Sequence, residues 1–163
     1  MSTRNLTIAA CIVFAAAACA ARAESPRLGR PISQADLAPW DINVLPDGRN
    51  LPPGHGTAAE GAKIFAEKCA LCHGENGRGG HAARLVGGPP KASLDPGSKT
   101  IANYWPYATT LFDFIRRSMP FTQPRSLTNE EVYALVAYIL AENKLIGAED
   151  EMNATTLPKV RMP

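Results

Sequence analysis

The sequence predicts an all-α domain with an extended N-terminal arm before it and a tail after it. Two capping boxes, Thr57 with Glu60 and Thr128 with Glu131, each stand directly before apolar residues at helical spacing. No stretch shows the sustained apolar and polar alternation that is typical of strands. The length of 163 residues suits one domain. Together these observations favour a small helical fold.

The first 23 residues predict a cleavable secretory signal peptide. Arg4 precedes a short apolar run without charge, and the segment ends on an Ala-Arg-Ala sequence. Cleavage after Ala23 would deliver a mature chain of 140 residues (163 − 23) to the periplasm, with no membrane span. The alternatives are a retained membrane anchor, which the small residues of the segment disfavour, and a lipoprotein modified at Cys19. The large aliphatic residue usual three positions before a lipidated cysteine is missing there.

Cleavage also changes the charge and the cysteine count. The precursor holds 17 Lys and Arg against 15 Asp and Glu, and Arg4 and Arg22 leave with the signal peptide, so 15 of each sign remain. This balance does not suggest nucleic-acid binding. Of the four cysteines, only Cys69 and Cys72 belong to the mature chain.

Residues 24–56 are predicted to form a proline-rich extended arm with turns, such as the one at 46–48. The arm is not purely polar, because it carries Trp40, Ile42 and Val44. We therefore expect it to lie along the domain or along a partner.

The domain is predicted over residues 57–146, and its first helix begins at Thr57. Gly61 within this helix costs helix stability, which suggests a close crossing with another helix. One face of the helix carries its apolar residues, namely Ala58, Gly61, Ile64, Phe65 and Cys69.

Residues 74–100 are predicted to be a loop, because glycine and proline dominate the segment. Residues 110–117 read as a short helix. The last helix follows Thr128, with Tyr133 and Tyr138 flanking its apolar stripe of Val132, Leu135, Val136 and Ile139. We expect this helix to cross the first one at Gly61. A polar tail, residues 147–163, completes the chain.

The segment CALCH at residues 69–73 carries the strongest chemical signal, and three interpretations compete. A thioredoxin-like redox pair requires a βαβ context that the flanking sequence lacks. A structural zinc site requires four ligands, and the mature chain offers no further cysteine and only His55 and His81 beyond His73. The third interpretation is covalent haem attachment, for which C-x-x-C-H is the recognised spacing.

Haem attachment gives each residue of the motif a role. Cys69 and Cys72 would form thioethers with the haem vinyl groups, and His73 would bind the iron from one face. A backbone carbonyl usually orients such a histidine through its other ring nitrogen. We expect that carbonyl to come from residues 88–90.

A second axial ligand is expected on the other face, and Met119 is the preferred candidate. It stands at the end of a predicted helix and directly before Pro120, which places it on a loop. Met152 and Met162 are the other methionines of the mature chain, and we expect them to fill gaps in the core. His81 lies among glycines and is expected to face solvent.

The aromatic and basic residues of the middle segment are each open to more than one interpretation. Tyr104, Trp105 and Tyr107 either contact a haem propionate or pack as ordinary aromatic residues. Arg116 and Arg117 either offset propionate charge or meet a partner, or they are a solvated pair.

The capped helix with CALCHG, the Gly/Pro loop, the SMPF segment and the Tyr-bearing last helix resemble a class I cytochrome c over residues 57–145. The resemblance implies an all-α domain around one covalently bound haem c. It also implies Cys69 and Cys72 as attachment sites, His73 as proximal ligand and Met119 as distal ligand.

A narrower resemblance covers nearly the whole mature chain. The stretches LGRPISQADLAPWDINVLPDGRNLPPGHG, TIANYWPYATTLFDFIRRSMPF, LTNEEVYALVAYILAEN and LPKVRMP are similar to the haem c subunits of bacterial sulfite dehydrogenases and of the Sox sulfane dehydrogenase. The resemblance implies two partners, a molybdenum-cofactor dehydrogenase subunit that supplies electrons and another cytochrome c that accepts them.

The expected function is therefore single-electron transfer without catalysis by this chain alone, since no base, nucleophile or substrate pocket is visible in the sequence. Two alternatives remain open. One is a freely diffusing electron-shuttle cytochrome c. The other is a haem-based ligand sensor or peroxidase-like enzyme, which requires an open sixth position on the iron.

Overall fold

The computed structural model describes residues 28–163 except 90, 92 and 94, so the predicted signal peptide lies outside the described residues. The chain divides into two units at the bond between Asp41 and Ile42. The first unit contains α2 (Gln34–Leu37), a single capped turn. Within the described part of the chain, no helix is long and apolar enough to cross a membrane.

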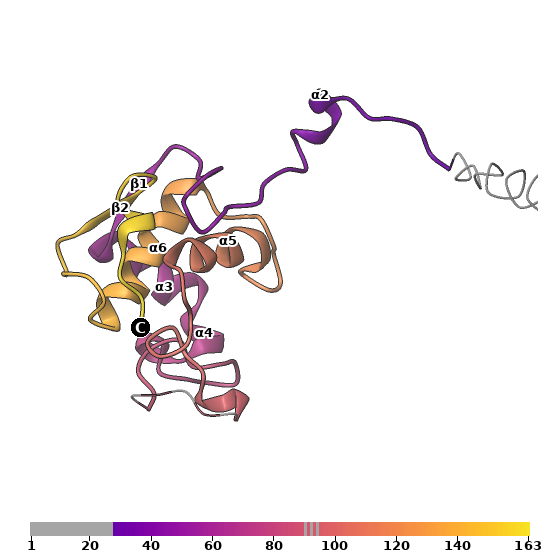
Figure 1. The fold of residues 1–163 in the computed structure, drawn as a ribbon. Helices are drawn as coiled ribbons and strands as arrows, with labels where there is room; N and C mark the ends of the chain where they lie inside the picture. The colour runs from indigo at the N-terminus through magenta and orange to yellow at the C-terminus, as the bar shows by residue number, and fades with distance from the viewer. Residues whose placement is uncertain (1–27, 90, 92, 94) are drawn as a thin grey trace, which may run out of the picture. The chain divides into compact units, whose positions relative to one another are not determined.

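Three longer helices build the second unit, as Figure 1 shows: α3 (Ala58–Lys68), α5 (Ala108–Ser118) and α6 (Asn129–Glu142). Helix α6 packs against both of the others. The helical fold predicted from the sequence is confirmed. Between α3 and α5 the described residues form short turns, namely α4 (Ala70–His73), η1 (Glu75–Gly77) and η2 (Pro96–Ser98).

Both predicted capping boxes start their helices. The Thr57 hydroxyl accepts the Glu60 N–H, and a Glu60 carboxylate oxygen accepts the Thr57 N–H at 2.9 Å. Thr128 and Glu131 repeat the arrangement at α6, again with a 2.9 Å bond from the Thr128 N–H. Each box satisfies backbone donors that the first turn of a helix leaves without a partner.

Helices α3 and α6 cross closely at Gly61. A Cβ atom at this position would overlap the carbonyl of Ala134 and lie only 2.7 Å from Cβ of Tyr138. Only glycine lets the two backbones approach this far. The close crossing predicted from Gly61 is therefore confirmed.

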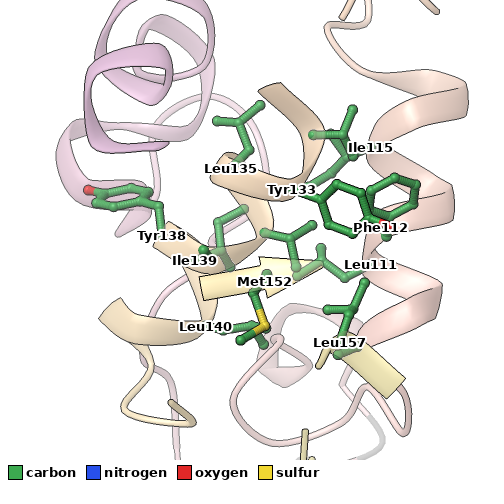
Figure 2. Packing of buried hydrophobic residues seen from close by; sticks show 14 of the residues in the cluster. Leu111, Phe112, Ile115, Tyr133, Leu135, Tyr138, Ile139, Leu140, Met152 and Leu157 are labelled. Carbon is green, nitrogen blue, oxygen red and sulfur yellow. The ribbon is translucent and has the colours of Figure 1, made fainter. Parts of the chain in front are cut away.

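Helix α6 forms the centre of the core, as Figure 2 shows. Its residues from Val132 to Leu140 are all buried, which is more than the single stripe that the sequence predicts. Tyr133 and Tyr138 were expected to flank the stripe, but they are buried because α5 and α3 cover them from two sides. Their rings lie 4.5 Å from Phe112 and 5.1 Å from Phe65, respectively, between centroids.

The structure also contains two short strands that the sequence does not predict. Strand β1 (His55–Thr57) pairs in antiparallel fashion with β2 (Glu151–Asn153), and Gly56 stands opposite Met152. Three residues are too few to show an alternating pattern. The pairing brings the tail onto α6, where Met152 and Leu157, the first residue of η3 (Leu157–Lys159), are buried in the core.

Residues 42–53 are fastened to the helices by side-chain hydrogen bonds. An Asp113 carboxylate oxygen accepts the Val44 N–H at 3.1 Å, and the Tyr133 hydroxyl donates to the Pro52 carbonyl at 2.9 Å. The Arg117 guanidinium pairs with Asp113 at 2.8 Å and also reaches the Ile42 carbonyl at 3.4 Å. This part of the arm therefore lies along the domain, as expected.

Candidate haem-binding site

The CALCH segment forms one helical turn directly after α3. Cys69 ends α3, with its N–H bonded to the Phe65 carbonyl at 2.9 Å. The Cys69 carbonyl then accepts the N–H groups of Cys72 and His73 at 3.1 and 3.0 Å. Both cysteines are free and half-buried. The turn thus presents two thiols and one imidazole in a fixed order.

The protonation state of the Cys69 thiol helps to choose among the three interpretations of this turn. Burial raises the pKa of Cys69 to about 11, so the group is a neutral thiol at neutral pH. A cysteine that binds zinc or belongs to a redox-active pair reacts as the thiolate, so its pKa is usually lowered. Among the described residues, no three His, Cys, Asp or Glu side chains gather as a metal-binding group. The protonated Cys69 thiol and the lack of such a group among the described residues disfavour the zinc and thioredoxin-like interpretations.

The His73 ring is oriented by a backbone carbonyl. Its Nδ1 atom lies 2.7 Å from the Ala83 carbonyl oxygen. Because a carbonyl only accepts, Nδ1 must carry the proton, and Nε2 keeps a lone pair for a metal ion. The expectation that residues 88–90 would supply this carbonyl is wrong, since the loop turns back earlier in the chain.

Two backbone hydrogen bonds explain the early return of the loop. The His73 carbonyl accepts the Gly79 N–H, and the Cys72 carbonyl accepts the Ala82 N–H, both at 2.9 Å. A third contact follows at Gly77, whose carbonyl accepts two N–H groups from residues 85 and 86. The loop therefore closes over α4 within ten residues of the motif, before the glycine and proline residues on which the prediction relied.

The end of α6 holds the next part of this loop. The Asn143 side chain donates to the Leu85 carbonyl at 3.0 Å and accepts the Gly87 N–H at 2.9 Å. The Tyr138 hydroxyl donates to the Asn76 side chain at 3.2 Å. Sequence reasoning missed Asn143, whose only signal is an asparagine just after a helix. These contacts fix the loop to the core rather than leaving it to solvent.

Met119 lies where the sequence predicts it, at the end of α5. Its N–H still bonds to the Ile115 carbonyl at 3.0 Å, but its own backbone is extended. The residue is half-buried and packs against the core. Its role as an axial ligand stays a prediction. Met152 is buried in the core, Met162 is half-buried against it, and His81 is exposed.

Thr100 is a buried polar residue that no sequence pattern selects. It is 2% exposed, and within the described residues its hydroxyl is the buried side-chain oxygen that lacks a hydrogen-bond partner. The N–H of the same residue donates to Asn103, which also binds the Pro89 carbonyl. Thr100 therefore stands in a loop that is tied together internally, with a buried hydroxyl that has no partner within the described residues.

The remaining aromatic and basic candidates differ in how far they are buried. Trp105 is half-buried and packs edge-on to Phe114, whereas Tyr104 and Tyr107 are exposed. Arg117 is not a solvated residue, because it binds Asp113 and the arm. At the CALCH turn, a Cys69 thiol that burial keeps protonated and a His73 imidazole with a free Nε2 fit a covalently held haem.

Comparisons with known proteins identify the family of this chain. The family model for cytochrome c matches residues 58–142. A solved structure, the sulfane dehydrogenase SoxCD from Paracoccus pantotrophus, contains a chain that is 37% identical, with a TM-score of 0.75, over 85% of this chain and 69% of that chain.

A curated relative extends the comparison. Thiosulfate dehydrogenase from Stutzerimonas stutzeri (strain A1501) is 32% identical over 110 residues, which is 61% of this chain. The chain matches only 35% of the length of that relative.

Proposed function

Because the chain belongs to the cytochrome c family, we propose that it carries single electrons as the haem subunit of a molybdenum-dependent sulfite or sulfane dehydrogenase. Members of this family bind haem c covalently. The observation that carries the proposal is the CALCH turn, in which both thiols are half-buried, burial keeps the Cys69 thiol protonated, and His73 is already oriented. No other segment of the chain offers this combination, since Cys69 and Cys72 are the only cysteines after the predicted cleavage point.

The residues divide the work of holding the haem. Cys69 and Cys72 would fasten it covalently, His73 would bind the iron through Nε2, and Met119 would be the second protein ligand of the iron. The haem supplies an iron that takes up and releases one electron. The Ala83 carbonyl keeps the His73 ring in one orientation, and Met119 directly follows α5, whose inner face is buried in the core.

The proposed assembly rests on the names and extents of the relatives. SoxCD is a sulfane dehydrogenase, and its matching chain covers most of this one. The second relative is a thiosulfate dehydrogenase, so both act on reduced sulfur compounds. In the assembly, a molybdenum-cofactor subunit supplies the electrons and a separate cytochrome c accepts them. The predicted signal peptide supports a periplasmic location.

This chain alone is proposed to have no catalytic activity. The similarity to thiosulfate dehydrogenase covers only about a third of that protein, so the activity of the whole relative does not carry over to this chain. A direct test mixes the purified haem protein with sulfite or thiosulfate and follows haem reduction optically. Reduction is expected only after the molybdenum-cofactor subunit is added. Reduction by the isolated chain would make it an enzyme.

The axial ligand provides the first test. The exported haem protein should show the weak far-red charge-transfer band that reports a methionine sulfur on oxidised haem iron. Met119→Ala should lose this band, and Met152→Leu, which changes a buried methionine of the core, should keep it. A band that survives in Met119→Ala would assign the distal position to another residue.

The alternatives make opposite predictions about ligand access. A haem with both axial positions filled should not bind carbon monoxide at neutral pH in its reduced form, whereas a sensor or peroxidase-like enzyme should bind it readily. Carbon monoxide binding by the wild type, without a far-red band, would favour the sensor. A freely diffusing shuttle would keep the band but form no stable complex with a molybdenum-cofactor subunit.

A further inference from the structure

Residues 28–41, which we call the strap, carry apolar side chains that this chain leaves in solvent. Trp40 is 76% exposed and Ile32 is 63% exposed. The other exposed apolar residues of the strap are Leu28 and Leu37. Single exposed apolar residues are normal on a protein surface, but several in one short segment, one of them tryptophan, mark an interaction site.

The strap has local structure without a core of its own. The Ser33 hydroxyl accepts the Asp36 N–H, and an Asp36 carboxylate oxygen accepts the Ser33 N–H at 3.1 Å, which makes a complete capping box. The Leu37 carbonyl then accepts the Trp40 N–H at 2.9 Å. No residue of α2 is buried. A preformed turn lowers the ordering cost of binding to a partner.

The chain is firmly anchored directly after the strap. Ile42 and Asn43 accept hydrogen bonds from the Arg117 guanidinium at 3.4 and 3.1 Å, and the Val44 N–H donates to Asp113. The boundary between the two units lies just before this anchor. The strap is thus tethered to the cytochrome unit at one fixed point, which raises its effective concentration near any partner that the unit contacts.

The extent of the SoxCD match indicates which partner the strap serves. Residues 42–163 make up 122 of the 163 residues, about 75% of the chain, whereas the match covers 85%. The matching SoxCD chain therefore shares residues before Ile42, in the region of the strap. A chain of a dehydrogenase complex and this chain thus both have a segment before the cytochrome unit. A role of this segment in such a complex would explain why both chains have it.

We propose that the strap docks in an apolar groove of the molybdenum-cofactor subunit, with Trp40 and Ile32 as its anchoring side chains. The inference rests on the proposed function and names the contact that would hold the two subunits together. Large aromatic residues that become fully desolvated dominate the binding energy of most interfaces. The anchor at Arg117 and Asp113 would then keep the haem unit close to the catalytic subunit. The surface of the haem unit would stay free to face the electron acceptor.

The test measures affinity for the molybdenum-cofactor subunit, purified from the native complex and identified by its molybdenum content. The full mature haem protein is compared with a Trp40→Ala and Ile32→Ala double variant and with a Gln34→Ala control, which changes an exposed polar residue of α2. We expect at least tenfold weaker binding for the double variant and unchanged binding for the control. A variant that lacks residues 28–41 should bind as weakly as the double variant.

The haem spectrum and the thermal unfolding midpoint separate a loss of docking from a loss of folding, and both should match the wild type in every variant. Wild-type affinity in the double variant and in the deletion would overturn the strap while leaving the proposed function intact. Failure of the wild type itself to bind the molybdenum-cofactor subunit would overturn both.

Discussion

At the scale of single residues, Tyr133 connects the centre of the core to the arm. Its side chain is fully buried, and its hydroxyl donates to the Pro52 carbonyl at 2.9 Å. Burial raises the pKa of Tyr133 to about 12, from an ordinary value of 10.0. The phenol therefore stays protonated in the folded protein at a pH where the unfolded chain releases its proton.

This pKa difference predicts a loss of stability at high pH. The stabilisation is complete below about pH 10 and is lost as the pH rises through the folded value of about 12, because only the folded state retains the proton. One such group changes the free energy of unfolding by up to about 1.4 kcal/mol per pH unit. Tyr133→Phe should lose about 1 kcal/mol at pH 8 through the missing hydrogen bond, and its stability should fall less steeply above pH 10.

Urea unfolding of both proteins at pH 8 and pH 11, followed by circular dichroism, measures this difference. Tyr138, whose pKa is also raised by burial, remains in both proteins and cancels in the comparison. An equal fall in the free energy of unfolding for the two proteins would show that Tyr133 does not retain its proton.

The sequence predicts individual site residues only where side-chain identity carries the signal. Cys69, Cys72 and His73 follow from their spacing, and Met119 from the proline after it. Ala83 acts through its backbone carbonyl, which every residue possesses, so no sequence pattern could select it. Thr100 becomes notable only because the fold buries its hydroxyl without a partner.

At the scale of elements, the crossing of α3 and α6 depends on one missing side chain. Gly61→Ala would place a methyl group against the Ala134 carbonyl, which belongs to the backbone of a fully buried helix and cannot move aside. We expect a loss of about 1–3 kcal/mol in the free energy of unfolding, as is usual for overpacked cores. Chemical denaturation of the haem protein measures it.

Gly97→Ala is the matched control for this prediction. Gly97 is exposed, and a Cβ atom there would lie 3.6 Å from its nearest neighbour, the Asp95 side chain. The control should unfold at the wild-type denaturant concentration. Equal stability of Gly61→Ala and the wild type would mean that the helices separate at low cost, so that the crossing does not hold the motif-bearing helix in place.

Helices of several turns that begin with a capping box are predictable from this sequence. Short strands that pair with residues far away in the sequence are not. The capping boxes locate the beginnings of α3 and α6 to the residue. Helix α5 has no side-chain cap and is longer than the predicted 110–117. The strands β1 and β2 are three residues each and meet only because the segment before α3 and the tail after α6 both pack on α6, which no local pattern encodes.

At the scale of the whole molecule, the segments at the two ends of the described chain differ in how much of their apolar side chains is exposed. The tail after α6 is polar in composition, yet Met152 and Leu157 are buried and β2 pairs with β1. The strap is apolar in part, yet Trp40 and Ile32 lie in solvent. Composition alone would assign the two segments the other way round, since hydrophobicity does not indicate whether a side chain is buried by its own chain or by a partner.

Two truncations of the haem protein test this division. Removal of residues 150–163 deletes β2 and two buried side chains, and opening a cavity in place of one large buried residue typically costs about 2–5 kcal/mol. The combined loss is comparable with the whole stability of a small domain, about 5–15 kcal/mol, so this variant should unfold at a much lower temperature or fail to accumulate as haem protein.

Removal of residues 28–41 is the matched truncation and should leave the thermal midpoint of the isolated haem protein unchanged, because the hydrogen bonds that fasten the arm begin at Ile42. Comparison of the thermal unfolding midpoints of the two truncated proteins shows which of the two segments is packed against this chain. If the strap deletion lowered the midpoint as much as the tail deletion, Trp40 and Ile32 would have to pack on this chain in solution. They would then be core residues of the cytochrome unit rather than contacts held ready for the catalytic subunit.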